Sequence, residues 1–146
     1  MDLEKRFALL QNTYAMSIAE TVNTYDKLKV LDSLVERRKE RQVQTAPFLT
    51  QQLGIETVED VFYKLSEIYG CANWLVEKKD DGYIATAGSC KLCAFSKKMG
   101  GANPCHGWCL DPMLAMITAV AKLDAGSIVV ESTLMTGDSC KVLVNI

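Results

Sequence analysis

Apolar side chains recur at three- and four-residue steps through the first part of the chain, which is the pattern of an amphipathic helix. The residues that carry this stripe are Leu3, Phe7, Leu10, Tyr14 and Ile18. A break is predicted at Asn23–Thr24, after which the stripe resumes, so that helices occupy residues 1–42 and end before the connection that Pro47 marks. The next helix is predicted to begin at Thr57, a capping residue, and to end at Gly70.

Short β-rich segments separated by turn residues replace this pattern in the second half of the chain. Residues 73–77 and 83–87 flank an Asp-Gly turn and predict a β-hairpin. Residues 127–134 and 141–146 predict a second hairpin.

A long segment and a helix lie between the two hairpins. Residues 88–108 hold several glycines and are predicted to form a loop, with a short helical turn near residues 91–98. A loop of this length inside a compact domain usually has a function. A buried helix is predicted to begin at Asp111–Pro112, where Asp is a favoured N-cap and Pro a favoured first residue, and to stop at Gly126.

The order of these elements predicts an α+β fold: a four-stranded, mainly antiparallel sheet of two hairpins packed with helices, and an N-terminal helical region. A length of 146 residues is that of one ordinary domain. We therefore expect one domain over residues 1–146, with a helical part over residues 1–70 and a cysteine-rich part of sheet and helix over residues 71–146.

Charge and hydropathy argue against several classes of partner. The 16 basic and 18 acidic residues give a net charge of −2, which offers no electrostatic reason to expect nucleic acid or a membrane surface as partner. The longest apolar stretch, residues 112–120, is well short of the roughly 20 residues that cross a bilayer. The charged N-terminus lacks the apolar core of a signal peptide, so a cytoplasmic protein is expected.

Two features of the N-terminal helices bear on how the protein assembles. The run of charges over residues 36–41 is predicted to be a solvated helix end, with cations near the negative end of the helix dipole. The heptad-like spacing of apolar residues allows helix pairing between two copies, although Ser17 and Thr24 interrupt the seam. A homodimer is therefore the assembly that this pattern allows.

Six cysteines carry most of the candidate chemistry, and five of them lie in the last part of the chain. A Cys90-x2-Cys93 pair and a Cys105-x3-Cys109 pair flank a glycine-rich loop, and Cys140 follows the last turn. Thiolates bind zinc and also hold iron–sulfur clusters. We therefore predict a zinc site on these five residues, with an iron–sulfur cluster or a set of small buried hydrophobic side chains as the alternatives.

Cys109, His106 and Asp111 are the candidates for catalysis. Cys109 precedes the predicted buried helix, whose positive end would favour its thiolate. His106 is the only histidine and is predicted to be a metal ligand or a proton-transfer group. Asp111 is predicted to be a helix cap first and a base second. Trp108 would line any cavity at this end of the helix, whereas Cys71 is expected to be structural.

Three motifs of the second half resemble a known family. Residues 90–95, 104–111 and 133–142 resemble the cysteine-containing loop, the Cys-and-Asp helix entry and the closing strand of the L-2-amino-thiazoline-4-carboxylic acid hydrolase-like family. The last motif also resembles the end of 4-vinyl reductase (hydrocarbon-binding) domains, in which a Glu precedes the closing hairpin, as Glu131 does here. Leu134 stands where those domains tend to have a further cysteine.

The resemblance to the hydrolase-like family implies an enzyme that opens a small cyclic C–N substrate such as a 2-amino-thiazoline carboxylate. A water activated by the predicted metal, or the Cys109 thiolate itself, would attack the ring carbon. His106 or Asp111 would move the protons.

The alternative is a non-enzymatic sensor that binds a small molecule or hydrocarbon, with a structural zinc or iron–sulfur site. Both groups of relatives imply a pocket between sheet and helices, frequently within a dimer. The residues expected to line that pocket are Trp108, Met113, Met116 and Glu131.

Overall fold

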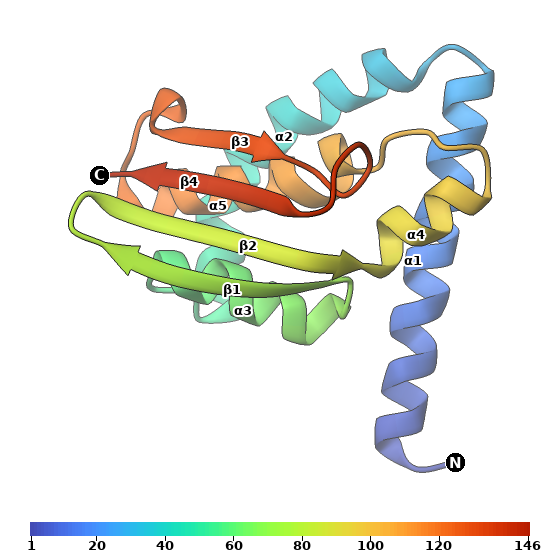
Figure 1. The fold of residues 1–146 in the computed structure, drawn as a ribbon, viewed down its shortest axis with the longest axis horizontal. Coiled ribbons are helices and arrows are strands. Elements are labelled where there is room, and N and C mark those ends of the chain that lie inside the picture. The colour runs from blue at the N-terminus through green and yellow to red at the C-terminus, as the bar shows by residue number, and fades with distance from the viewer.

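The computed structural model describes residues 1–146, apart from the side chain of Ala125. It is an α+β fold in which helices lie against one face of a four-stranded antiparallel sheet (Figure 1), as the order of elements predicts. In chain order the helices and strands are α1 (Leu3–Lys27), α2 (Leu31–Leu53), α3 (Val58–Tyr69), β1 (Ala72–Lys79), β2 (Gly82–Cys90), α4 (Lys91–Lys98), α5 (Leu110–Ala121), β3 (Ile128–Ser132) and β4 (Cys140–Asn145). Two short helical turns lie between these elements: Cys105–Cys109, called here the cysteine turn, and Ala125–Ser127.

The sheet has the strand order β1-β2-β4-β3, so the two predicted hairpins meet along β2 and β4. Neighbouring strands are antiparallel, and the register places Ala87 opposite Cys140 and Gly82 opposite Asn145. Burial alternates along β4, where Val142 is fully buried and the residues on either side are partly exposed. One face of the sheet therefore packs on helices, as expected for an antiparallel sheet.

Helix α3 begins and ends where its sequence predicts. The Thr57 side chain accepts a hydrogen bond from the Asp60 N–H at 3.1 Å, and the Asp60 carboxylate accepts one from the Thr57 N–H at 3.2 Å, which completes a capping box. Gly70 ends the helix with a φ of 64°, a left-handed conformation that favours glycine. Val61 and Phe62 are fully buried where this helix packs against the core.

Helix α1 does not break at Asn23–Thr24 but continues to Lys27. The reason is that the buried Asn23 side chain finds partners from another part of the chain. Its amide donates to the Ser96 hydroxyl at 3.0 Å, and its oxygen accepts from the Ala102 N–H at 2.9 Å. Asn23 therefore joins α1 to α4 and the loop that follows, instead of ending the helix.

Helix α2 runs through Pro47, so the prediction of a connection at that residue is wrong. Proline removes one helical hydrogen bond, which costs a few kcal/mol in a helix interior, about 3 in typical cases. Ala46 and Thr50 beside it are buried, and α2 packs along α5. Because tertiary packing supplies most of the stability of protein helices, it outweighs the lost hydrogen bond.

The buried helix α5 begins and ends earlier than predicted. Cys109 is its N-cap, and Asp111 lies within its first turn. The Asp111 carboxylate accepts a hydrogen bond from the Gly107 N–H at 2.7 Å, so Asp111 stabilises the cysteine turn rather than capping the helix. The chain leaves the helix at Lys122, whose φ is 53°, before it reaches Gly126.

The N-terminal turns of α1 extend beyond the body of the molecule (Figure 1). The predicted apolar stripe is exposed there, since Leu3 is 80% and Leu10 is 67% exposed. Burial begins at Ala15, along the part of α1 that packs against α4 and α3. The homodimer expected from this stripe stays a prediction, which the mass of the protein in solution tests.

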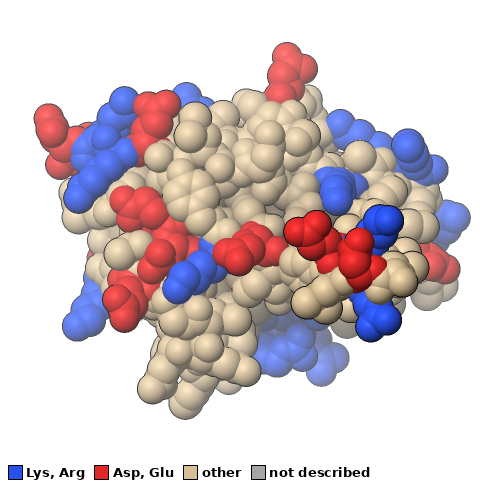
Figure 2. Space-filling view, turned by 90° about the horizontal axis from the view of Figure 1, so that it is seen from below, with Lys and Arg blue, Asp and Glu red and all other residues tan. Residues whose placement is uncertain are grey.

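The lower face of the molecule carries both acidic and basic side chains (Figure 2). This mixture fits the near balance of 16 basic and 18 acidic residues. Among the described helices, none combines the length with the apolar run that a bilayer crossing requires.

Candidate functional site

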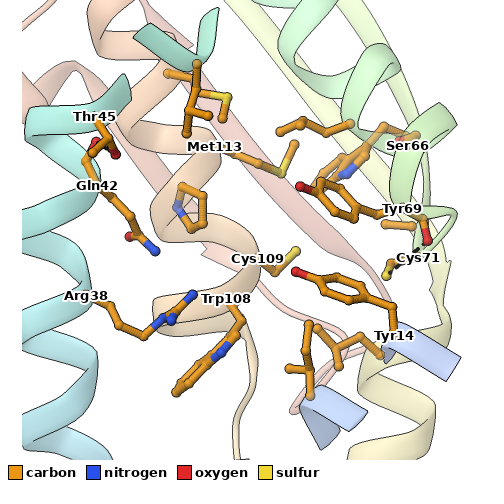
Figure 3. A pocket seen from close by; sticks show the side chains of 18 of the residues that line it. Tyr14, Arg38, Gln42, Thr45, Ser66, Tyr69, Cys71, Trp108, Cys109 and Met113 are labelled. Carbon is orange, nitrogen blue, oxygen red and sulfur yellow. Dashed lines mark hydrogen bonds between the residues drawn. The ribbon is translucent and has the colours of Figure 1, made fainter. Parts of the chain in front are cut away.

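A cavity of about 270 Å³ lies between α2, α5, α3 and α1 (Figure 3). Its volume is close to the lower end of the range of roughly 300–1,000 Å³ in which small-molecule pockets fall. Its larger aliphatic and aromatic side chains include Ile18, Leu49, Leu65, Trp74, Leu92, Met113 and Met116. Such a lining favours an apolar ligand, because binding removes the apolar surfaces of both partners from water.

Helix α2 supplies the polar wall of the cavity. Arg38, Gln42 and Thr45 follow one face of the helix, and Arg41 joins them from its exposed edge. Nε of Arg38 donates to the Gly107 carbonyl at 2.9 Å, and Nε2 of Gln42 donates to the same oxygen at 2.7 Å. These hydrogen bonds fasten the α2 wall to the cysteine turn.

The Arg38 guanidinium lies over the Trp108 ring, with Cζ 4.6 Å from the ring centroid (Figure 3). Burial lowers the pKa of Arg38, and the neighbouring Arg41 lowers it further. Arginine stays charged under both influences because its pKa begins so high. None of the ion pairs among the described residues includes either guanidinium.

Two polar atoms of the lining, Oε1 of Gln42 and Oγ of Ser66, are buried without a hydrogen-bond partner among the described residues. An unpaired buried polar atom costs about 1–3 kcal/mol, so native proteins rarely keep one without a reason. Gln42 belongs to α2 and Ser66 to α3, on opposite sides of the cavity (Figure 3). A hydrogen-bonding group from outside the chain would satisfy either atom if it reached that atom.

The wall opposite α2 carries aromatic and thiol side chains. Tyr14 of α1 stacks on Tyr69 of α3, with ring centroids 5.2 Å apart. Burial raises the pKa of Tyr14, so its phenol stays neutral at physiological pH. Cys71 follows α3, with its sulfur 3.7 Å from the Tyr69 carbonyl oxygen. Cys109 lies between the two walls, at the start of α5 (Figure 3).

The cysteine turn requires glycine at position 107. Gly107 has a φ of 87°, in the left-handed region that favours glycine. A Cβ at this position would lie 3.2 Å from Cγ2 of Val35 on α2. Gly107 therefore lets the turn approach α2 closely enough for its carbonyl to accept from both Arg38 and Gln42.

The five cysteines predicted to converge do lie near one another, beside the cavity. The sulfurs of Cys93 and Cys105 are 3.7 Å apart, and Cys90 lies close enough to Cys93 for that neighbour to raise its pKa. Cys109 and Cys140 lie close enough to Cys90 for a thiolate at Cys90 to raise the pKa of each. All five are free thiols, and we call them the cysteine cluster.

The surroundings of Cys93, Cys109 and Cys140 in the cluster, and of Cys71 outside it, raise the pKa of each thiol. The hydrogen bond with Cys105 is the largest influence on Cys93, whose pKa is raised to about 12. Burial raises the pKa of Cys71 and of Cys140 to about 11, and it raises the pKa of Cys109 well above the ordinary value. Burial raises the pKa of Cys109 and so opposes the expected activation of its thiolate by the α5 dipole.

The donor type of the cysteine cluster suits a soft metal such as zinc or the iron of an iron–sulfur cluster. Within the described part of the chain, however, no group of three or more Cys, His, Asp or Glu side chains is arranged to hold a metal ion. The thiols of Cys93 and Cys105 instead hydrogen-bond to each other. Zinc and iron–sulfur binding stay predictions that rest on the spacing.

His106 and Asp111 pair with each other and do not belong to the described lining of the cavity. His106 Nδ1 lies 3.2 Å from Asp111 Oδ1, and this hydrogen bond raises the pKa of His106. Burial raises the pKa of Asp111, but the hydrogen bonds from His106 and Gly107 outweigh burial, so the pKa falls below its ordinary value. The pair therefore holds the cysteine turn in place.

Trp108, Met113 and Met116, three of the four residues expected in a ligand pocket, line this cavity. The fourth, Glu131, lies on β3 and pairs with Lys141 at 3.1 Å, outside the described lining. Cys71, expected to be structural, is part of the lining.

The polar wall of α2 is the part of the site that the sequence did not reveal. Arg38 and Arg41 belong to the charged run that was expected to be a solvated helix end, and both line the cavity. One available signal is that polar residues continue an apolar stripe at helical spacing. The residues of that stripe are Val35, Arg38, Gln42, Thr45 and Leu49.

Comparisons of the chain with protein-family models, with curated proteins and with solved structures found no significant match. The resemblance to the L-2-amino-thiazoline-4-carboxylic acid hydrolase-like family and to 4-vinyl reductase domains therefore stays a prediction. The geometry of the cavity and of the cysteine cluster is therefore the basis for a functional hypothesis.

Proposed function

We propose that this protein binds a small, largely apolar molecule in the cavity between α2, α5, α3 and α1, as a sensor or binding domain rather than as an enzyme. The observation that supports this most directly is the pair of unpartnered buried atoms, Gln42 Oε1 and Ser66 Oγ, in a mainly apolar lining. A molecule that hydrogen-bonds to them removes a cost that the free protein carries. Binding therefore also stabilises the fold.

The state of the other polar side chains supports binding over catalysis. A hydrolase needs an activated nucleophile and a proton-transfer group within reach of the substrate. Cys109 lines the cavity, but burial raises its pKa and keeps it a thiol. His106 of the cysteine turn and Asp111 of α5 are engaged with each other.

Binding of phenylnaphthylamine, an uncharged apolar fluorophore, tests the proposal. Thr45→Trp places an indole in the cavity from α2, whereas Val43→Trp places the same group on the outer side of that helix, where Val43 is 65% exposed. We expect the wild type and Val43→Trp to bind the fluorophore with equal affinity. We expect Thr45→Trp to bind at least about tenfold more weakly, because the indole occupies the space of the ligand.

Circular dichroism of each variant shows whether it has folded. Should Thr45→Trp not fold, Leu49→Trp fills the cavity from its more exposed rim and takes its place. Binding that is absent in the wild type, or that is equal in the wild type and a folded cavity-filling variant, contradicts the proposal.

A hydrolase acting on a small cyclic C–N substrate is the second candidate, favoured by the position of the Cys109 thiol in the lining. Its test is turnover of 2-amino-thiazoline-4-carboxylate: water adds to the ring carbon, the ring C–N bond breaks and the departing nitrogen takes a proton. Turnover that Cys109→Ala abolishes and the exposed variant Val43→Ala retains would establish this activity. A wild type without turnover removes this candidate.

A further inference from the structure

Resting on the proposed binding function, we propose that the ligand of this cavity is an organic anion: a flat apolar body that carries one carboxylate or sulfonate group. Arg38 and Arg41 hold the acidic group at the α2 wall, and the apolar body lies toward Trp74 and Met113.

The charge of the cavity lining carries the first step of this inference. The lining holds two guanidinium groups and, in the part of the chain that the structure describes, no carboxylate. The other titratable side chains that face the cavity are two phenols and two thiols, which are uncharged at neutral pH. They are Tyr14, Tyr69, Cys71 and Cys109. A bound anion would therefore balance positive charge that the lining itself leaves unbalanced.

The orientation of Arg38 carries the second step. Its Nε donates to the Gly107 carbonyl at 2.9 Å, and its guanidinium lies on the Trp108 ring with Cζ 4.6 Å from the centroid. These two contacts fix the plane of the guanidinium and leave its terminal nitrogens for a ligand. A guanidinium held in this way suits a planar or forked acid group, which accepts two parallel hydrogen bonds.

The neighbours of Arg38 on α2 carry the third step. Arg41 follows three residues later and reaches the cavity from its exposed edge, so a second cation lies where the acid group enters. Gln42 lies four residues after Arg38, and its Oε1 is buried without a partner among the described residues, so an N–H or O–H on the body of the ligand, beside the acid group, would suit it. The α2 wall thus offers hydrogen-bonding groups for the polar end, and the rest of the lining receives the apolar body.

Two fluorophores that differ by one acid group provide the test. Anilinonaphthalene sulfonate and phenylnaphthylamine share their rings and their N–H, and only the first carries a sulfonate. We expect Arg38→Met to weaken binding of the sulfonate probe at least about tenfold while changing binding of the uncharged probe less than about twofold. Arg41→Met should have the same selectivity with a smaller effect, because Arg41 lies at the exposed rim.

Two further variants serve as controls. Arg37→Met removes an equal charge from the exposed side of the same helix and should leave the affinity for both probes unchanged. Arg38→Lys keeps the charge and loses the fork, so it should recover part of the affinity for the sulfonate probe.

The outcomes separate this inference from the proposed function. If neither probe binds the wild type, the binding function itself fails. If the uncharged probe binds and neither arginine variant affects the sulfonate probe selectively, the ligand is not an anion and the binding function stands. If Arg38→Met loses affinity for both probes, the substitution has changed the shape of the cavity. The inference is then judged by whether Arg41→Met weakens binding of the sulfonate probe selectively.

Discussion

The cavity and the cysteine cluster lie side by side, and both hold polar or polarisable side chains in buried surroundings. They differ in whether those side chains have interaction partners within the protein. In the cavity, Gln42 Oε1 and Ser66 Oγ lack partners, and two guanidinium groups lack a counter-charge among the described residues. In the cluster, the sulfurs of Cys93 and Cys105 contact each other at 3.7 Å. The polar groups of the cavity therefore lack partners among the described residues, whereas Cys93 and Cys105 are partners of each other.

This difference teaches that a conspicuous set of residues is not by itself a reactive site. Five clustered cysteines predict chemistry, yet burial or hydrogen bonding raises the pKa of Cys93, Cys109 and Cys140 and so disfavours their reactive thiolates. The less conspicuous α2 wall holds polar atoms at a cost, and that cost is what indicates a function. Measurements that separate satisfied from unsatisfied groups therefore test both interpretations.

The largest expected effect is on thiol reactivity. A rise in the pKa of Cys71 or Cys140 from 9.0 to about 11 lowers the thiolate fraction about a hundredfold near neutral pH, and the thiolate is the reactive form. We therefore expect iodoacetamide to modify the native protein, treated with a chelator, at least about a hundredfold more slowly than the unfolded protein. Mass spectrometry of the alkylated peptides measures each site.

One thiol that reacts at the rate of the unfolded chain would contradict this account of the cluster. If that thiol is Cys109, the hydrolase becomes the better hypothesis. Analysis of the untreated protein for zinc and iron accompanies the measurement, because a bound metal would protect the same residues and would support the prediction from their spacing.

A smaller effect is expected from closing the contact between the cysteine turn and α2. Gly107→Ala forces alanine into a left-handed conformation and brings its Cβ to 3.2 Å from Val35, so we expect a loss of about 2 kcal/mol of unfolding free energy. Gly101 has a similar φ of 84° with nothing within 4 Å of an added Cβ, so Gly101→Ala should lose only about 1 kcal/mol. Urea denaturation measures both variants.

The same pair should differ in ligand binding. Gly107→Ala displaces the carbonyl that Arg38 and Gln42 share, so it should weaken binding of phenylnaphthylamine, whereas Gly101→Ala should not. Equal effects of the two substitutions on stability and on binding would show that the cysteine turn does not determine the positions of the Arg38 and Gln42 side chains.

Removal of two buried serine hydroxyls should change the free energy of unfolding in opposite directions. Ser66→Ala removes a hydroxyl that has no partner among the described residues, so we expect it to stabilise the fold by about 0.5–1 kcal/mol. Ser96→Ala removes a hydroxyl that accepts from Asn23 at 3.0 Å and donates to the Ala102 carbonyl, so it should destabilise by about 1–2 kcal/mol. Thermal and urea denaturation measure the difference. Destabilisation by both variants would mean that Ser66 has a partner within the protein.

The smallest effect concerns pH. The pKa of His106 is raised above 6.5 by Asp111, so the contribution of the pair is complete below pH 6.5 and is lost as the pH rises through the raised pKa. The pKa of Asp111 is lowered below 3.8, so its own contribution is present above that value and is lost as the pH falls through the lowered pKa. We expect the unfolding free energy to fall modestly as the pH rises through the raised pKa of His106.

His106→Gln is the control for this pH dependence. It removes the titrating group, so the fall in stability above pH 6.5 should disappear while the fold is retained. The effect is small because the His106 side chain is 50% exposed and solvent screens its charge. An unchanged pH profile in this variant would contradict the role of the pair in holding the cysteine turn.

Most features of the fold that the sequence predicted correctly come from local signals. The Thr57–Asp60 capping box and Gly70 delimit α3, and the Asp81–Gly82 pair closes the first hairpin, because these residues act through neighbours within a few positions. Asn23 and Pro47 misled because what they do depends on distant partners: Ser96 and Ala102 for Asn23, and α5 for the helix around Pro47.

The candidate site divides in the same way. Trp108, Met113 and Met116 could be expected in a pocket because they flank or lie in a helix whose apolar character predicts burial. Arg38 and Arg41 could not, because a charged run at the end of a helix is ordinarily solvated. Only the approach of the cysteine turn, through Gly107, shows that this part of α2 faces a cavity.

By itself the sequence determined the α+β class, the two hairpins and the ends of α3, since periodicity, capping and turn chemistry act over short distances. Tertiary structure alone decided which polar atoms stay unpaired and which thiols stay protonated. Both properties depend on desolvation and on partners that come from remote segments, and a linear order of residues contains neither.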